Sequence, residues 1–76
     1  MAASNENDLQ QKAIRYLKSH YSEDTVSMDI RENGVKDGDG TLHVDCTVSV
    51  GGAHSDWTKW FTFRDGEVVN MRWKMR

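Results

Sequence analysis

The feature that most constrains this chain is a change in the spacing of its apolar residues near position 24. The residues before it follow a helical stripe made of Leu9, Ala13, Tyr16, Leu17 and His20. From Asp24 onward apolar and polar residues alternate, most regularly between Leu42 and Val50. A period near 3.6 is typical of an amphipathic helix, and a period of two is typical of strands with one buried face. We therefore predict a helix over about Glu6–Tyr21, capped by Asn5, followed by strands.

Glycine-rich breaks divide the alternating half into four strands. Asn33-Gly34 and the stretch from Asp37 to Gly40 mark a long connection, and Gly51-Gly52 has the composition of a two-residue hairpin turn. Asp65-Gly66 marks the last turn. Consecutive strands joined by short turns pair as an antiparallel meander. The predicted fold is therefore α+β, with one helix packed on a four-stranded antiparallel sheet, and the predicted domain spans residues 5–76 after a flexible tail at 1–4.

The register of the last two hairpins follows from matching their apolar faces. Directly opposed residues in an antiparallel pair point to the same side of the sheet. A Gly51-Gly52 turn matches the faces of the two strands that it joins. For the last hairpin we expect a three-residue loop, Arg64-Asp65-Gly66, because a two-residue Asp-Gly turn would set Phe61 against Asn70. The core under the helix is then predicted to contain Trp57, Phe61, Phe63 and Trp73.

The opposite, open face of the sheet is predicted to carry the candidate binding residues. The register places His43, Trp60 and Asn70 in one cross-strand row. The next row contains Asp45, Thr58 and Arg72. Tryptophan and arginine dominate the energetics of many protein interfaces, so these six residues form the predicted partner-binding set.

Three interpretations of Trp60 stay open at this stage. Its ring can act as an exposed contact for a partner, or it can simply cover its neighbours by stacking on His43 or Arg72. In the third, a bulge between Asp56 and Trp60 turns Trp60 inward and Lys59 outward. Lys59 is the reason to consider this alternative, because the expected register places its charged side chain in a core row.

Catalytic and metal-binding patterns are not found. The three histidines are spread along the chain, and the single cysteine, Cys46, falls in an apolar strand position where a thiol is expected to be inert. The acidic loop from Asp37 has Val48 at the position where a calcium loop needs glutamate. We therefore expect no cofactor, no metal and no enzymatic activity.

The charge and apolar content of the chain restrict the kinds of partner that it can bind. The net charge is −2, which does not indicate a polyanion-binding chain, and acidic residues accompany the basic ones near Trp60. No apolar run approaches the ~20 residues of a membrane span. The first residues lack the basic and apolar regions of a signal peptide, so the expected location is the cytoplasm.

The segment from Trp60 to Trp73, "WFTFRDGEVVNMRW", resembles the closing hairpin of nuclear transport factor-like and SnoaL-like proteins, which belong to the cystatin-like superfold. The resemblance covers about the last quarter of the chain. It implies a helix on a curved antiparallel meander and transfers no active-site residue, because the several helices of those proteins and the inhibitory wedge of the cystatins have no counterpart here.

Three functions remain as expectations. The first is a small non-catalytic interaction module that binds a protein partner or itself, as a homodimer, through the open face. The alternative is a small-molecule-binding or enzymatic domain of the transport-factor-like type, with a cavity lined by Tyr16, His20, Trp57 and Trp73. The third, which the acidic residues disfavour, is a domain that binds single-stranded nucleic acid.

Overall fold

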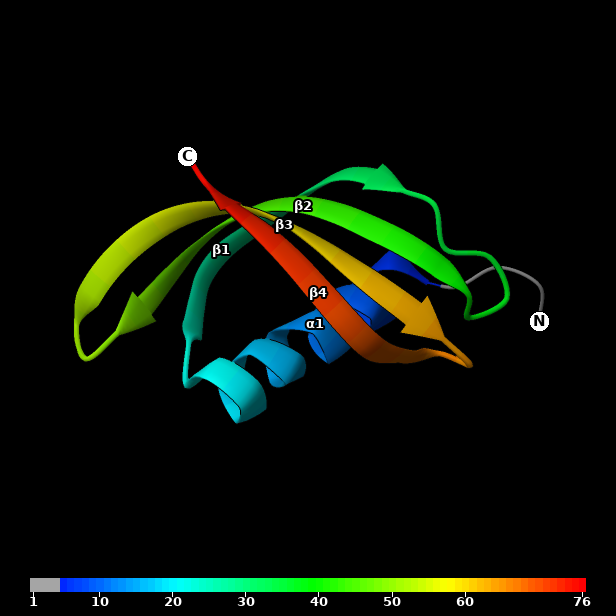
Figure 1. Ribbon diagram of the computed structural model, residues 1–76, viewed down its shortest axis with the longest axis horizontal. Coiled ribbons are helices and arrows are strands. Elements are labelled where there is room, and N and C mark those ends of the chain that lie inside the picture. Colours follow the sequence, from blue (N-terminus) through cyan, green and yellow to red (C-terminus); the bar gives the residue numbers. More distant parts are fainter. Residues whose placement is uncertain (1–4) are drawn as a thin grey trace.

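The computed structural model describes residues 5–76 and contains one helix and four strands (Figure 1). The elements are α1 (Glu6–Tyr21), β1 (Asp24–Asn33), β2 (Gly40–Val50), β3 (Ala53–Arg64) and β4 (Glu67–Met75). All neighbouring strands pair antiparallel in the order β1-β2-β3-β4, which confirms the predicted fold class. The flexible tail predicted at 1–4 lies outside the described residues.

Helix α1 begins and ends at caps that the local sequence supplies. The Asn5 side chain accepts hydrogen bonds from the backbone N–H groups of Asn7 and Asp8, at 2.8 and 3.4 Å, as predicted. At the other end Ser22 adopts the left-handed conformation, and the Glu23 N–H donates to the Leu17 carbonyl at 3.2 Å. This cap reverses the chain so that Glu23, the next residue, lies under the sheet.

The sheet arches over α1, which lies against its concave face (Figure 1). The buried core joins three helix residues to the concave face of β2, β3 and β4, and the β1–β2 connection adds Val35. Its members are Leu9, Ala13, Leu17, Val35, Leu42, Val44, Cys46, Val48, Phe61, Phe63 and Met71. The other face is convex and has no covering element in the described part of the chain. It is the face predicted to be open.

The β2–β3 hairpin has the predicted register. Gly51 and Gly52 form the whole turn with φ values of 58° and 86°, and Val50 opposes Ala53. Two successive positive φ values define a type I′ turn, whose twist suits a two-residue hairpin. The alternation therefore carries through unbroken, and Lys59 faces the concave side while Trp60 faces the convex side. The bulge that would have reversed Lys59 and Trp60 is absent from β3.

The predicted three-residue loop between β3 and β4 is wrong. Arg64 opposes Glu67, so Asp65 and Gly66 alone form the turn, again with two positive φ values (53° and 79°). This turn alone would set the apolar face of β3 against the polar face of β4. A bulge at Val69, between Val68 and Asn70, shifts the register of β4 and brings the apolar faces together again. Phe61 consequently opposes Met71, and Met71 takes the core position expected for Val69.

The same shift moves Trp73 out of the predicted core. Trp73 opposes Lys59 instead of Trp57 and remains 53% exposed. It faces the concave side beyond the end of α1, where the Tyr21 ring meets it edge-on at a centroid separation of 6.0 Å. Trp57 does pack against the core, as predicted, and Phe61 and Phe63 are buried.

Candidate functional site

The six residues predicted for partner binding all belong to strands of the convex face, but their rows differ from the prediction. Arg72, not Asn70, opposes Trp60, and Lys74, not Arg72, opposes Thr58. Asn70 opposes Thr62, one row further along. The cause is the two-residue turn together with the bulge at Val69, each of which slides β4 by one position relative to the expected register. The row that contains Trp60 therefore gains a guanidinium.

We call the residues Glu32, His43, Trp60 and Arg72 the Trp60 row, because they oppose one another across all four strands. The His43 and Trp60 rings stack at 5.0 Å with an interplanar angle of 14°. On the other side the Arg72 guanidinium carbon lies 5.7 Å from the centre of the Trp60 ring. This geometry matches the interpretation in which Trp60 covers its neighbours by stacking on His43 and Arg72. Trp60 is half-buried and lies between the His43 imidazole and the Arg72 guanidinium.

The row next to Trp60 is internally paired. The Thr58 hydroxyl donates to Asp45 at 2.8 Å, and the Arg31 guanidinium lies 3.5 Å from the other carboxylate oxygen of Asp45. On the far side of the Trp60 row, a shallow depression of about 330 Å³ is lined by Glu32, Gly34, Thr41, His43 and Trp60. The face thus combines an ordered aromatic row with a recess beside it.

Charge on the convex face is segregated across the strands. Asp29, Glu32 and Asp45 lie on β1 and β2, whereas Arg72 and Lys74 lie on β4. Arg31 is the exception on the acidic side, and it is the residue that faces Asp45. One end of the Trp60 row is therefore an acid and the other end is a base.

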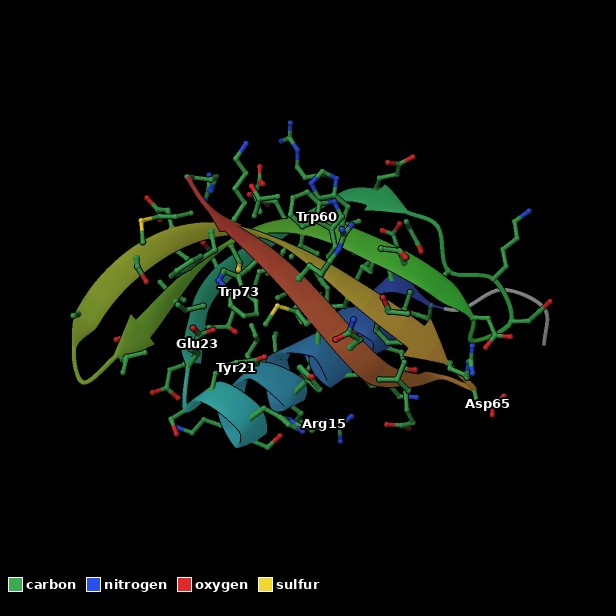
Figure 2. The ribbon with its side chains drawn as sticks, in the orientation of Figure 1. Arg15, Tyr21, Glu23, Trp60, Asp65 and Trp73 are labelled. Carbon is green, nitrogen blue, oxygen red and sulfur yellow. The ribbon has the colours of Figure 1, made fainter. Side chains whose placement is uncertain are left out.

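A second site, which the sequence prediction missed, lies on the concave side beyond the C-terminal end of α1. The Lys59 ammonium lies 3.2 Å from Glu23 Oε1, with only 3% of the Lys59 side chain and 14% of the Glu23 side chain exposed. Figure 2 shows Glu23, Tyr21 and Trp73 gathered on this side, opposite Trp60. We call the hollow at this ion pair the aromatic pocket. It measures about 180 Å³ and is lined by Tyr21, Glu23, Trp57, Lys59, Met71 and Trp73.

Two aromatic rings lie close to the Lys59 charge. The ammonium lies 5.0 Å from the centre of the Trp57 ring and 5.9 Å from that of Tyr21, distances at which ring quadrupoles attract a cation. The Lys59 ammonium neutralises the carboxylate by charge, but buried Glu23 Oε1 accepts no hydrogen bond of good geometry within residues 5–76. A lysine in a core row was the sequence signal for this site. Its partner was not predictable, because Glu23 follows the helix in a connecting segment.

The cavity predicted for the small-molecule alternative does not form as one unit. Trp57 and Trp73 line the aromatic pocket, whereas Tyr16 and His20 line a separate surface groove of about 570 Å³ beside the start of β4. In that groove the Tyr16 and His20 rings stack at 4.1 Å. The four residues are thus divided between two places.

The structure also bears on two kinds of site considered from the sequence, a reactive thiol and a metal site. Burial raises the pKa of the Cys46 thiol from 9.0 to about 11, so little nucleophilic thiolate exists at neutral pH. Across residues 5–76, no group of three or more His, Cys, Asp or Glu side chains is placed to hold a metal ion. In the same range no helix is long and apolar enough to cross a membrane.

Searches of protein-family models, curated protein sequences and solved structures found no match to this chain. The resemblance to the cystatin-like superfold therefore stays a prediction, and the functional argument rests on the geometry above.

Proposed function

We propose that this chain is a small interaction module without catalytic activity that associates with a second copy of itself through the Trp60 row. The observation that carries the proposal is the order of charges along that row, from Glu32 on β1 to Arg72 on β4. The stacked rings at its centre are already ordered, which lowers the entropic cost of forming a contact.

The row is complementary to itself under one symmetry. A two-fold axis that runs parallel to the strands, between β2 and β3, reverses the strand order of the second copy. Arg72 of one copy then faces Glu32 of the other, and Trp60 faces His43. A two-fold axis perpendicular to the strands would instead set β4 against β4 and bring Arg72 against Arg72. Closed dimers need a self-complementary patch, and only the first arrangement supplies one.

The shape of the face limits the strength of this association. The sheet is convex on this side, so two copies meet along a narrow band and not over a whole face (Figure 1). A standard interface buries about 800 Å² on each partner, and a band of a single row buries less. We therefore expect a weak, reversible dimer with a dissociation constant on the order of 0.1 mM.

The test is sedimentation equilibrium at protein concentrations from roughly ten-fold below to ten-fold above this expected dissociation constant. Trp60→Ala should leave a monomer throughout the range. Glu32→Arg and Arg72→Glu should each weaken the dimer, because like charges then meet, and the double variant should restore it. Arg15→Glu, which makes the same change of charge at an exposed position of α1, is the matched control. A wild-type chain that stays monomeric at the highest concentration, or a double variant no better than the singles, would show that the proposal is wrong.

A further inference from the structure

The two edges of the sheet are built differently. The edge strand β1 pairs with β2 through two register shifts, at Val26 and at Arg31. Such bulges twist a strand edge and protect it from pairing with another chain. The edge strand β4 has its single shift near its start, and the run from Asn70 to Met75 then pairs with β3 without interruption. In the described chain no strand covers the outer edge of this run, which is thus the regular, open edge of the sheet.

The exposed side chains of this run alternate between charge and apolar surface. Arg72 and Lys74 point to the convex side, and both are exposed. Trp73 and Met75 point to the concave side with 53% and 66% of their surface exposed. Tyr21, 40% exposed, extends this apolar surface to the rim of the aromatic pocket. A strand added to the edge would therefore meet basic groups on one face and a bulky apolar surface on the other.

A second copy of β4 is a poor occupant of this edge. Opposed residues in an antiparallel pair must share a face, which restricts the registers that two copies can adopt. The two registers with most pairs within Asn70–Met75 oppose Arg72 either to Arg72 or to Lys74 of the other copy. Like charges directly opposite one another destabilise a strand pair. The edge therefore favours a strand with acidic residues at these positions.

We infer that β4 accepts an extended segment of a partner protein in which acidic residues alternate with bulky apolar ones. The segment adds a fifth strand through backbone hydrogen bonds, the usual mode in which a peptide extends an open sheet edge. Its acidic side chains oppose Arg72 and Lys74, while its apolar side chains pack over Trp73 and Met75 beside the aromatic pocket. This surface is distinct from the Trp60 row of the proposed function, although Arg72 borders both.

The experiment uses capped six-residue peptides and ¹⁵N-labelled full-length chain. A Glu-Leu repeat peptide should shift the backbone amide signals of residues 70–75 most strongly, and a Lys-Leu repeat peptide should bind at least about ten-fold more weakly, given two opposed charge pairs. The double variant with Arg72→Glu and Lys74→Glu should reverse this preference. Arg15→Glu with Lys36→Glu changes two exposed basic residues elsewhere by the same total charge and should not. A Glu-Leu peptide N-methylated on alternate residues, which cannot pair along an edge, should lose binding.

Three results would overturn the inference. They are equal binding of the two peptides to the wild-type chain, unchanged binding after N-methylation, and amide shifts that centre on β1 or on the convex face away from β4. Repeating the titration with Trp60→Ala separates this inference from the proposed function. That variant lacks the proposed dimer contact but keeps Arg72 and Lys74, so it should still prefer the Glu-Leu peptide to the Lys-Leu peptide, and either proposal can fail without the other.

Discussion

Breaking the Lys59–Glu23 ion pair from one side should cost far more stability than removing both charges. Replacing one member of a buried pair leaves an uncompensated charge, which typically costs about 3–5 kcal/mol, whereas replacing both members by uncharged residues is often nearly neutral. The exposure of the charge that remains decides which single variant loses more stability. Glu23→Gln leaves an ammonium whose side chain is 3% exposed, whereas Lys59→Met leaves a carboxylate whose side chain is 14% exposed.

We therefore expect Glu23→Gln to lower the free energy of unfolding by about 3 kcal/mol and Lys59→Met by about 2 kcal/mol, the second being smaller because water reaches the carboxylate. The double variant should lose only about 1 kcal/mol, so that the coupling energy between the two sites is roughly 4 kcal/mol. A domain of this length has a total stability of about 4–11 kcal/mol, at roughly 0.05–0.15 kcal/mol per residue. Each single variant should therefore remain folded but unfold at clearly lower urea concentration.

Urea unfolding followed by circular dichroism measures all four corners of this cycle. The surface pair Lys18–Asp24 provides the control, because its charges are 2.7 Å apart but its side chains are 61% and 63% exposed. Exposed pairs contribute about 0.2–1 kcal/mol, so a cycle at Lys18 and Asp24 should give a small coupling energy. If the Lys59–Glu23 coupling is no larger than that of the surface pair, burial does not control the energetics of this contact and our reasoning about the pocket is wrong.

Three further outcomes test the local structure. Because the pKa of Cys46 rises from 9.0 in the unfolded chain to about 11 in the fold, stability should fall between about pH 9 and pH 11, by an amount on the order of 2 kcal/mol that Cys46→Ala abolishes in parallel urea titrations. Ser22→Gly should raise the thermal midpoint, because glycine adopts the left-handed cap conformation without strain and is worth about 0.5–1 kcal/mol here; a lower midpoint would refute the assigned cap. Gly66→Ala should destabilise the hairpin by about 1 kcal/mol or more, whereas Gly66→Asn, which tolerates positive φ, should cost less; equal losses would argue against the type I′ turn.

The sequence alone was sufficient for the order of elements and for much of the core. The helical stripe and its Asn5 cap predicted the observed bounds of α1, and uninterrupted alternation predicted the register of β2 with β3. Both succeed because each depends on residues close together in the chain. The unbroken parity of β3 also placed Lys59 on the concave side and Trp60 on the convex side, in spite of the charge on Lys59.

The errors arise where one pattern permits two backbone solutions. A face mismatch between β3 and β4 can be removed by a longer turn or by a bulge within a strand, and alternation does not distinguish the two. The structure has the bulge, at Val69, and this single choice exposed Trp73, buried Met71 and moved Arg72 beside Trp60. Four of the six predicted site residues kept their rows, since only the two on β4 depended on this choice. The Lys59–Glu23 pair was missed because β1, β2 and the first half of β3 separate the two residues in the chain.

The exposed aromatic surface near β4 follows from a difference in length between helix and sheet. The 16 residues of α1 span about 24 Å at 1.5 Å per residue. The 12 residues of β3 span about 40 Å at roughly 3.3 Å per residue, so one helix cannot cover the whole concave face. Uncovered positions in a domain that binds nothing are best occupied by polar residues, as at Ser55, which opposes Val48 on the concave side. At Tyr21, Trp73 and Met75 the chain instead exposes its larger apolar side chains around a buried ion pair. Folding alone does not require this choice, and contact with a partner at the β4 edge would account for it.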